Sequence, residues 1–173
     1  MTALPGLYKR IHSEAAARLN TALLKGFEQF AGAPETRRSH YFSGRYENIY
    51  ISAEQLPAYA ELLGIAREHA AAILGTSPQK LKAGGWFNAM GPGQATLMHS
   101  HDDNDEVLSA VYYVTAPDNS GVLVLMGDEG PVKVSPEAGS FVFFDAALDH
   151  EVSENRSDGL RLSIGMNFGY VED

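Results

Sequence analysis

The sequence predicts a mainly β protein, a β-sandwich or jelly roll, with two N-terminal α-helices packed on one of its sheets. Three observations predict it. Apolar residues recur at helical spacing in the first half of the chain, but from about Leu81 the period becomes that of strands. Turn signals rich in glycine and proline separate these strands, and no helical pattern intervenes. The last strand, Leu160 to Phe168, has one apolar face that needs helices over it and one polar face that needs a reason to be inside.

Two amphipathic helices are expected in the N-terminal half. The first spans residues 10 to 30, where Ser13 is available as an N-cap. The second runs from Gln55 to Leu74. Ser52 and Gln55 would form a capping box at its start, and Gly75 would end it. These helices are the elements that would cover the outer sheet.

The strands belong mainly to the second half of the chain. Residues 41 to 51 are rich in aromatic residues and suggest an irregular strand or a hairpin. About eight short strands follow, a number and spacing typical of sandwiches and jelly rolls. They are Leu81 to Met90, Ala95 to His101, Leu108 to Thr115, Gly121 to Met126, Val132 to Ser135, Ser140 to Phe144, His150 to Ser153 and Leu160 to Phe168.

Length and charge narrow the classes of function. A chain of 173 residues with 45% hydrophobic residues fits one domain, with residues 1–80 as helical support and 81–173 as the β core. The net charge of -9 and the absence of basic runs argue against nucleic acid and anionic membrane surfaces as partners. No apolar run is long enough to span a bilayer. The chain has no cysteine, which suits a reducing cytoplasm and leaves His, Asp and Glu as metal ligands.

One short stretch carries the candidate metal ligands. His99, His101 and Asp103 alternate along the sequence, so an extended strand would point all three to one face. His150 lies far downstream. A histidine and a carboxylate two residues apart, completed by a distant histidine, form the ligand set of a mononuclear iron(II) site with open positions.

The spacing of these residues resembles that of the iron(II)- and 2-oxoglutarate-dependent oxygenases. Their pattern is His-x-Asp, a distal His and then Arg-x-Ser, matched here by His101 with Asp103, by His150, and by Arg161 with Ser163. The resemblance covers roughly residues 84 to 169 and implies a double-stranded β-helix. It also implies that His101, Asp103 and His150 bind Fe(II), which leaves room for 2-oxoglutarate and O2. Arg161, helped by Ser163, would hold the distal carboxylate of 2-oxoglutarate.

Other segments are similar to narrower groups. Trp86 to Asn88 and Leu108 to Val114 look like a bacterial family of small 2-oxoglutarate oxygenases, and Phe144 to Val152 is similar to aspartyl/asparaginyl β-hydroxylases. By analogy with prolyl hydroxylases, Tyr113 would be a second contact to the co-substrate.

Two further residues are expected near this site. Asn88 would either cap a strand end or touch the co-substrate. His99 would lie beside the metal and form hydrogen bonds there, although direct ligation stays an alternative.

Two alternatives compete with this interpretation. The chain also approaches the cupin motifs, in which His99, His101, Glu106 and His150 would bind the metal of a dioxygenase or isomerase. The fold is the same in both cases. Arg161 and Ser163 favour the oxygenase, because the cupin pattern gives them no role. The non-catalytic alternative is a jelly-roll binding module with structural or zinc-binding histidines.

The expected function is therefore a hydroxylase. It would couple the decarboxylation of 2-oxoglutarate to the oxidation of a C–H bond in a second substrate, either a small molecule or a peptide or protein side chain. Apolar helix faces and an exposed sheet edge would permit a homodimer, but nothing in the sequence requires one.

Overall fold

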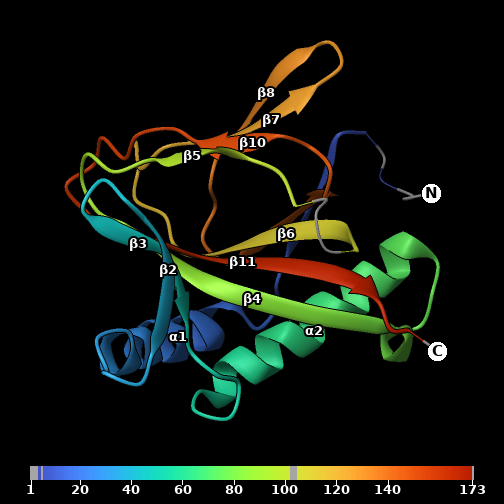
Figure 1. The fold of residues 1–173 in the computed structure, drawn as a ribbon, viewed down its shortest axis with the longest axis horizontal. Coiled ribbons are helices and arrows are strands. Elements are labelled where there is room, and N and C mark those ends of the chain that lie inside the picture. The colour runs from blue at the N-terminus through green and yellow to red at the C-terminus, as the bar shows by residue number, and fades with distance from the viewer. Residues whose placement is uncertain (1–3, 5, 102–104, 173) are drawn as a thin grey trace.

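Two antiparallel sheets lie one above the other in the computed structural model, which describes residue 4, residues 6–101 and residues 105–172 (Figure 1). The larger sheet has seven strands in the order β1-β9-β6-β11-β4-β3-β2, and the smaller has four in the order β5-β10-β7-β8. The bounds of the larger sheet's strands are β1 Tyr8–His12, β2 Arg37–Phe42, β3 Arg45–Tyr50, β4 Leu81–Met90, β6 Glu106–Thr115, β9 Ser140–Asp145 and β11 Arg161–Tyr170. Those of the smaller sheet are β5 Thr96–His99, β7 Leu123–Gly127, β8 Gly130–Val134 and β10 His150–Val152.

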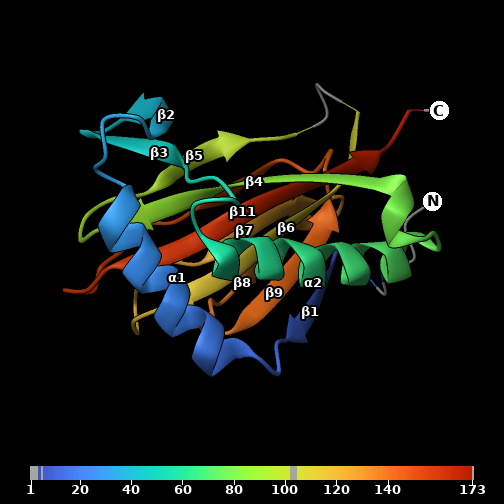
Figure 2. The same ribbon diagram turned by 90° about the horizontal axis from the view of Figure 1, so that it is seen from below.

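Both helices, α1 (Ala16–Phe30) and α2 (Pro57–Leu74), cover the outer face of the larger sheet (Figure 2). A single-turn 3-10 helix, Pro78–Lys80, connects α2 to β4. The main core lies between helices and sheet. Strand β11 contributes to it the alternating apolar residues Leu162, Ile164, Met166 and Phe168, which are all at most 1% exposed. The fold class predicted from the sequence is thus confirmed.

The first helix begins later than the sequence pattern predicts. Residues Tyr8–His12 form an edge strand that pairs with β9, with Ile11 opposite Phe141. Ile11 has helical spacing to Ala15 and Leu19, but its side chain packs on the same core from the strand. Tertiary pairing overrides the local pattern here because an edge strand gives β9 a backbone hydrogen-bond partner on its open side. The predicted N-cap, Ser13, precedes the helix by three residues and makes no side-chain cap.

The second helix has its predicted end and a shifted start. Ser52 and Gln55 do exchange capping-box hydrogen bonds of 3.2 Å, from the Ser52 N–H to Gln55 Oε1 and from the Gln55 N–H to Ser52 Oγ. These bonds close a turn before the helix, which begins at Pro57. Proline is favoured in a first helical turn because its missing N–H would have no intrahelical partner. Gly75 ends the helix with a φ of 66°, the left-handed conformation that glycine adopts easily.

The N-terminal half also supplies three strands of the larger sheet, of which the sequence pattern indicated only a strand or hairpin over residues 41 to 51. Strands β2 and β3 form the hairpin suggested for residues 41 to 51, with a turn at Ser43 and Gly44. The hairpin joins the sheet at Ile49, which is opposite Phe87 of β4. It then leaves the plane of the sheet and approaches β5, so it forms one wall beside the space between the sheets (Figure 2).

Candidate active site

The polar face of β11 forms the floor of a cavity of about 690 Å³ between the two sheets. Its four alternating residues, Arg161, Ser163, Gly165 and Asn167, all line this cavity. Their neighbours in sequence point the other way, into the core beneath the helices. The inward polar face that the sequence predicted for the last strand is therefore explained by the cavity that it lines.

Three histidines meet at this cavity. Strands β5 and β10 pair so that His99 lies directly opposite His150, and His101 follows two residues beyond His99. The ring centroids of His99 and His150 are 4.3 Å apart, and His101 lies 4.8 Å from the first and 5.1 Å from the second. One ligand atom from each ring lies within 4.8 Å of the others. A single metal ion could contact all three.

Hydrogen bonds fix the orientation of two of these rings. His99 Nδ1 lies 2.7 Å from the Leu97 carbonyl oxygen, and His150 Nδ1 lies 2.8 Å from the Leu148 carbonyl oxygen. A carbonyl only accepts, so each Nδ1 carries the proton and donates it. Each Nε2 then keeps a free lone pair, the arrangement in which a neutral imidazole binds a metal.

The surroundings keep the imidazoles neutral. Burial, reinforced by the neighbouring imidazoles of His150 and His99, lowers the pKa of His101 to about 3. Burial likewise lowers the pKa of His150 to about 4. Both imidazoles are therefore neutral at pH 7, so each keeps one nitrogen lone pair free and metal binding need not displace a proton from it.

Of the three predicted metal ligands, two belong to the described residues. His101 and His150 come together, and His99, expected beside the metal, belongs to the same cluster. Strand β5 ends at His99, so His101 lies in the segment that follows, where its N–H donates to the Ala146 carbonyl at 2.9 Å. Asp103, the predicted carboxylate ligand, falls outside the described residues, as does Asp102. Glu106 lines the cavity but is not in the cluster, so the described residues do not assemble the complete cupin ligand set.

Arg161 is a buried cation at the same cavity. It is 1% exposed, and its Nη1 donates to the carbonyls of Gly121 at 2.8 Å and Ser120 at 3.3 Å. Its Nε, buried as well, has no hydrogen-bond partner among the described residues. Burial lowers the pKa of Arg161, because the charged form loses water. An unpaired buried charge is costly, so this guanidinium fits an anionic ligand.

Ser163 and Tyr113, which were also predicted to contact the co-substrate, differ in whether they line the cavity. Ser163 lines the cavity and is 8% exposed. Tyr113 does not line it; its fully buried ring lies 5.3 Å from the Arg161 guanidinium carbon. Burial raises the pKa of Tyr113, and its hydroxyl has no hydrogen-bond partner among the described residues. Tyr113 thus contacts the cation rather than the open space.

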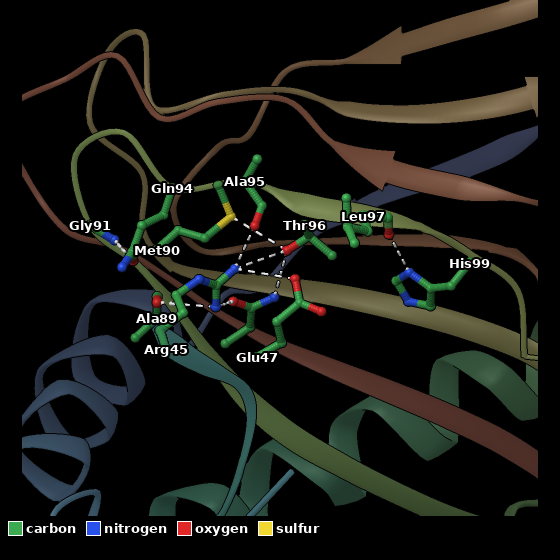
Figure 3. A network of polar contacts seen from close by, with 11 residues as sticks. Arg45, Glu47, Ala89, Met90, Gly91, Gln94, Ala95, Thr96, Leu97 and His99 are labelled. Atoms are coloured by element: carbon green, nitrogen blue, oxygen red, sulfur yellow. Dashed lines mark hydrogen bonds and ion pairs between the residues drawn. The ribbon is translucent and has the colours of Figure 1, made fainter. Parts of the chain in front are cut away.

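Arg45 is a structural centre of the site that sequence reasoning missed (Figure 3). This buried side chain of β3 donates to Asn88 Oδ1 at 2.8 Å, the Ala95 carbonyl at 2.9 Å, Thr96 Oγ1 at 3.2 Å and the Ala89 carbonyl at 3.3 Å. Asn88 in turn donates to Thr96 Oγ1 at 3.2 Å. Arg45 therefore ties β4 to the start of β5, the strand that carries His99. Asn88 has this bridging role while also lining the cavity.

Trp86 and Gly165 shape the floor. The two residues are paired across β4 and β11, and a Cβ on Gly165 would lie 2.6 Å from Trp86 Cε2. The indole thus lies directly over the glycine and is 5.3 Å from the His101 ring. Any larger residue at position 165 would lift the indole into the cavity.

These features define a class of protein: an antiparallel double-sheet fold in which a histidine cluster that could hold a metal ion and a buried arginine face one cavity. The family model of the 2OG-Fe(II) oxygenase superfamily matches residues 84–169. The chain belongs to this superfamily, whose typical cofactor and co-substrate are Fe(II) and 2-oxoglutarate. A search of curated proteins found no match.

Solved structures share the whole fold. A prolyl-4-hydroxylase from Pseudomonas putida superimposes with a TM-score of 0.76 at 22% identity, covering 94% of this chain and 92% of that chain. The epimerase SnoN from nogalamycin biosynthesis gives 0.74 at 16% identity, covering 95% and 76%. A prolyl hydroxylase from Trichoplax adhaerens, in complex with a peptide fragment, gives 0.73 at 16% identity, covering 96% and 84%.

No helix of the described chain is long and apolar enough to cross a membrane.

Proposed function

We propose that this protein is an iron(II)- and 2-oxoglutarate-dependent hydroxylase. The observation that carries the proposal is that the histidine cluster and the buried Arg161 face one cavity. The cluster supplies neutral nitrogen ligands, and the arginine supplies a fixed cation for a dicarboxylate. Bound iron would activate O2 and couple oxidative decarboxylation of 2-oxoglutarate to succinate with oxidation of a C–H bond in a second substrate.

His101 and His150 are two of the proposed iron ligands, and two residues compete for the third position. Asp103 is the ligand implied by the family pattern. The histidine cluster instead favours His99, because its ligand atom lies within 4.8 Å of those of the other two histidines. Either set of three ligands leaves positions open for a chelating 2-oxo acid and O2.

Variants separate these two ligand sets. With a three-histidine site, His99→Ala loses Fe(II) binding, while Asp103→Ala keeps it within a few fold. The reverse result assigns the third position to Asp103. Asp102→Ala is the matched control, since neither set uses it. Glu106→Ala tests the cupin set in the same titration, and loss of metal there would favour that alternative.

Arg161 is proposed to bind the distal carboxylate of 2-oxoglutarate. Its rigid fork can donate two parallel, charge-assisted hydrogen bonds, and its Nε is available for one of them. Ser163 lies two residues further along the same face and would add a hydroxyl donor. Tyr113 would act through Arg161, because its ring packs near the guanidinium carbon and holds that group in place.

The remaining cavity walls orient the second substrate and limit water. Trp86 covers the floor beside His101, and the hairpin residues Asn48 and Tyr50 line the opposite side. Proteins with this fold act on different substrates: one similar structure is a prolyl hydroxylase bound to a peptide, and another is an epimerase of nogalamycin biosynthesis. We propose hydroxylation of a small molecule or of a peptide side chain.

The direct test is an anaerobic titration of the iron(II)-loaded protein with 2-oxoglutarate. We expect a visible charge-transfer band on chelation and, once O2 is admitted, formation of succinate. Arg161→Ala should weaken the binding of 2-oxoglutarate, while Arg38→Ala should not, because Arg38 does not line the cavity and donates to the carbonyls of Ala31 and Ala33. The absence of both the band and O2-dependent succinate would refute the proposal.

A further inference from the structure

Glu106 places a negative charge at the boundary between two cavities. It lines the large cavity and also a smaller neighbouring cavity of about 380 Å³. Tyr50, Trp86 and Asn167 are shared by the two in the same way. From its sequence position, beside Asp102, Asp103 and Asp105, Glu106 would be expected in a solvated acidic turn. It is instead the first residue of β6, and its Oε2 is buried with no hydrogen-bond partner among the described residues.

The other charges lining the large cavity have counterparts. Glu47 lies 3.5 Å from the Arg45 guanidinium. Arg161 would be neutralised by the co-substrate under the proposed function. Among the described lining residues, the carboxylate of Glu106 is then the charge left without an opposite partner. A buried carboxylate oxygen without a donor is costly, and a cationic group that brings N–H donors offsets this cost.

Two cations of the protein itself could be considered first. The metal is one, but the carboxylate of Glu106 is not among the clustered ligand atoms of the described residues. Lys82 is the other, because it lines the smaller cavity. No ion pair within 4.0 Å joins Lys82 to Glu106 in the described chain. Lys82 is exposed, and its Cε lies over Gly169, the residue paired with Glu106, so Lys82 is the competitor that a Lys82→Met variant has to test.

The space beside Glu106 is open and connects to the metal cluster. Gly84 lines the smaller cavity, and a Cβ added there would meet nothing within 4 Å. Trp86, two residues further along β4, lines both cavities, and its ring lies 5.3 Å from that of His101. Along β11, Glu106 is paired with Gly169 and Trp86 with Gly165, a separation of about 13 Å at 3.3 Å per residue.

We infer that the second substrate is an elongated molecule that carries a cationic group, an ammonium or a guanidinium, and that Glu106 binds this group in the smaller cavity. This inference rests on the proposed function only for the reaction at the metal. The cation lies away from the reacting carbon, so Glu106 is a specificity-determining residue. Trp86 and Gly84 provide the apolar path between the two ends of the substrate.

The test measures binding directly, with the single tryptophan as reporter. Trp86 is the only tryptophan in the chain and lines both cavities, so its fluorescence reports occupancy. The protein, loaded with Fe(II) and 2-oxoglutarate without O2 and also metal-free, is titrated with Nα-acetyl-lysine methylamide and its neutral isostere Nα-acetyl-6-hydroxynorleucine methylamide. A second pair is Nα-acetyl-arginine and Nα-acetyl-citrulline methylamide.

We expect at least one cationic probe to bind tenfold or more tightly than its isostere. Glu106→Gln should reduce that preference to within twofold, and Glu154→Gln, an exposed carboxylate paired with Arg156, should leave it unchanged. Gly84→Leu should weaken the cationic probe, while Gly84→Ala should have little effect. Should Glu106→Gln fold poorly, the wild-type preference must still decline between 0.05 and 0.5 M salt.

Several results would overturn the inference: equal affinity within both pairs, no binding by either cationic probe, or a preference that salt does not change. A preference for the cationic probe that is seen only in Lys82→Met would also overturn the inference, because Lys82 itself would then occupy the subsite in the wild-type protein. The charge-transfer band is an independent readout. If it is present but no cation preference exists, only the substrate assignment fails. If the band is absent while the preference persists, the cation subsite stands without the oxygenase reaction.

Discussion

Replacing Arg45 with methionine tests whether the network in Figure 3 holds the metal site in place. Methionine keeps much of the buried stem of Arg45 but removes every donor. The acceptors on Asn88, Ala95 and Ala89 then lose their hydrogen bonds. Glu47, which lies 3.5 Å from the guanidinium, loses its counter-charge as well.

The expected cost follows from these contacts. Two of the hydrogen bonds are short, 2.8 Å to Asn88 and 2.9 Å to Ala95, and a bond from a charged donor contributes about 1.5–3 kcal/mol. Removing one partner of a buried charged pair costs about 3–5 kcal/mol. We therefore expect Arg45→Met to lower the free energy of unfolding by about 3–5 kcal/mol. For a chain of this size that lowers Tm by about 10 °C.

Urea and thermal denaturation of the metal-free protein, followed by far-UV circular dichroism, measure this change. Arg18→Met is the matched control, since it removes an exposed arginine paired with Glu61 and should leave the unfolding midpoint nearly unchanged. Fe(II) affinity should also decrease in Arg45→Met, because β5 carries His99 three residues after Thr96. A loss of stability below about 1 kcal/mol would refute the reasoning that this network is a buried support.

Three further predictions concern the cavity. In the metal-free protein, the pKa values of about 3 for His101 and about 4 for His150 lie below the ordinary value, so the unfolded chain binds more protons between about pH 4 and pH 6.5. Stability should therefore be full above about pH 6.5 and fall as the pH drops toward 4. Urea unfolding midpoints at pH 7.5 and pH 5 measure this loss of stability. The double variant His101→Gln, His150→Gln should flatten the pH dependence of the midpoint, whereas the control His12→Gln should not. Equal midpoints at the two pH values in the wild-type protein would contradict the prediction. Arg161→Lys should raise the Kd for 2-oxoglutarate about 10- to 100-fold, because lysine cannot reproduce the paired donors. Titration calorimetry measures this Kd, with Arg38→Lys as the control. An unchanged Kd would show that Arg161 does not bind the co-substrate. Gly165→Ala should shift the emission of Trp86, whose Cε2 would lie 2.6 Å from the new Cβ, whereas Gly84→Ala should not; an unshifted spectrum would show that the indole does not rest on Gly165.

The boundary of the first helix shows why a local pattern can mislead. Ile11 is apolar at helical spacing from Ala15, so residues 10 to 30 read as one helix. The side chain of Ile11 is equally well placed in a strand, where it packs on the same core opposite Phe141. The choice depends on an open sheet edge 130 residues away in the chain, which no local window contains.

The metal stretch shows a similar limit. The alternation of His99 and His101, and the distant His150, were sufficient to predict a metal site. Which of the nearby side chains share one centre depends on strand pairing: His99 is opposite His150 because β5 and β10 are neighbours. The role of Arg45 had no signal in the sequence, since its hydrogen-bond partners lie 43 to 51 positions downstream.

By itself, the sequence determined the mainly β fold with two covering helices and the inward polar face of β11, and it predicted the histidines and Arg161 as candidate site residues. Period and spacing are enough for these, because strand alternation and helix spacing are local properties of the chain. Only the tertiary structure decided that His99 joins the metal cluster, that Arg45 supports it, and that Glu106 faces a cavity rather than solvent. Each of these depends on which strands become neighbours, and pairing between distant segments is set by the burial of the whole core.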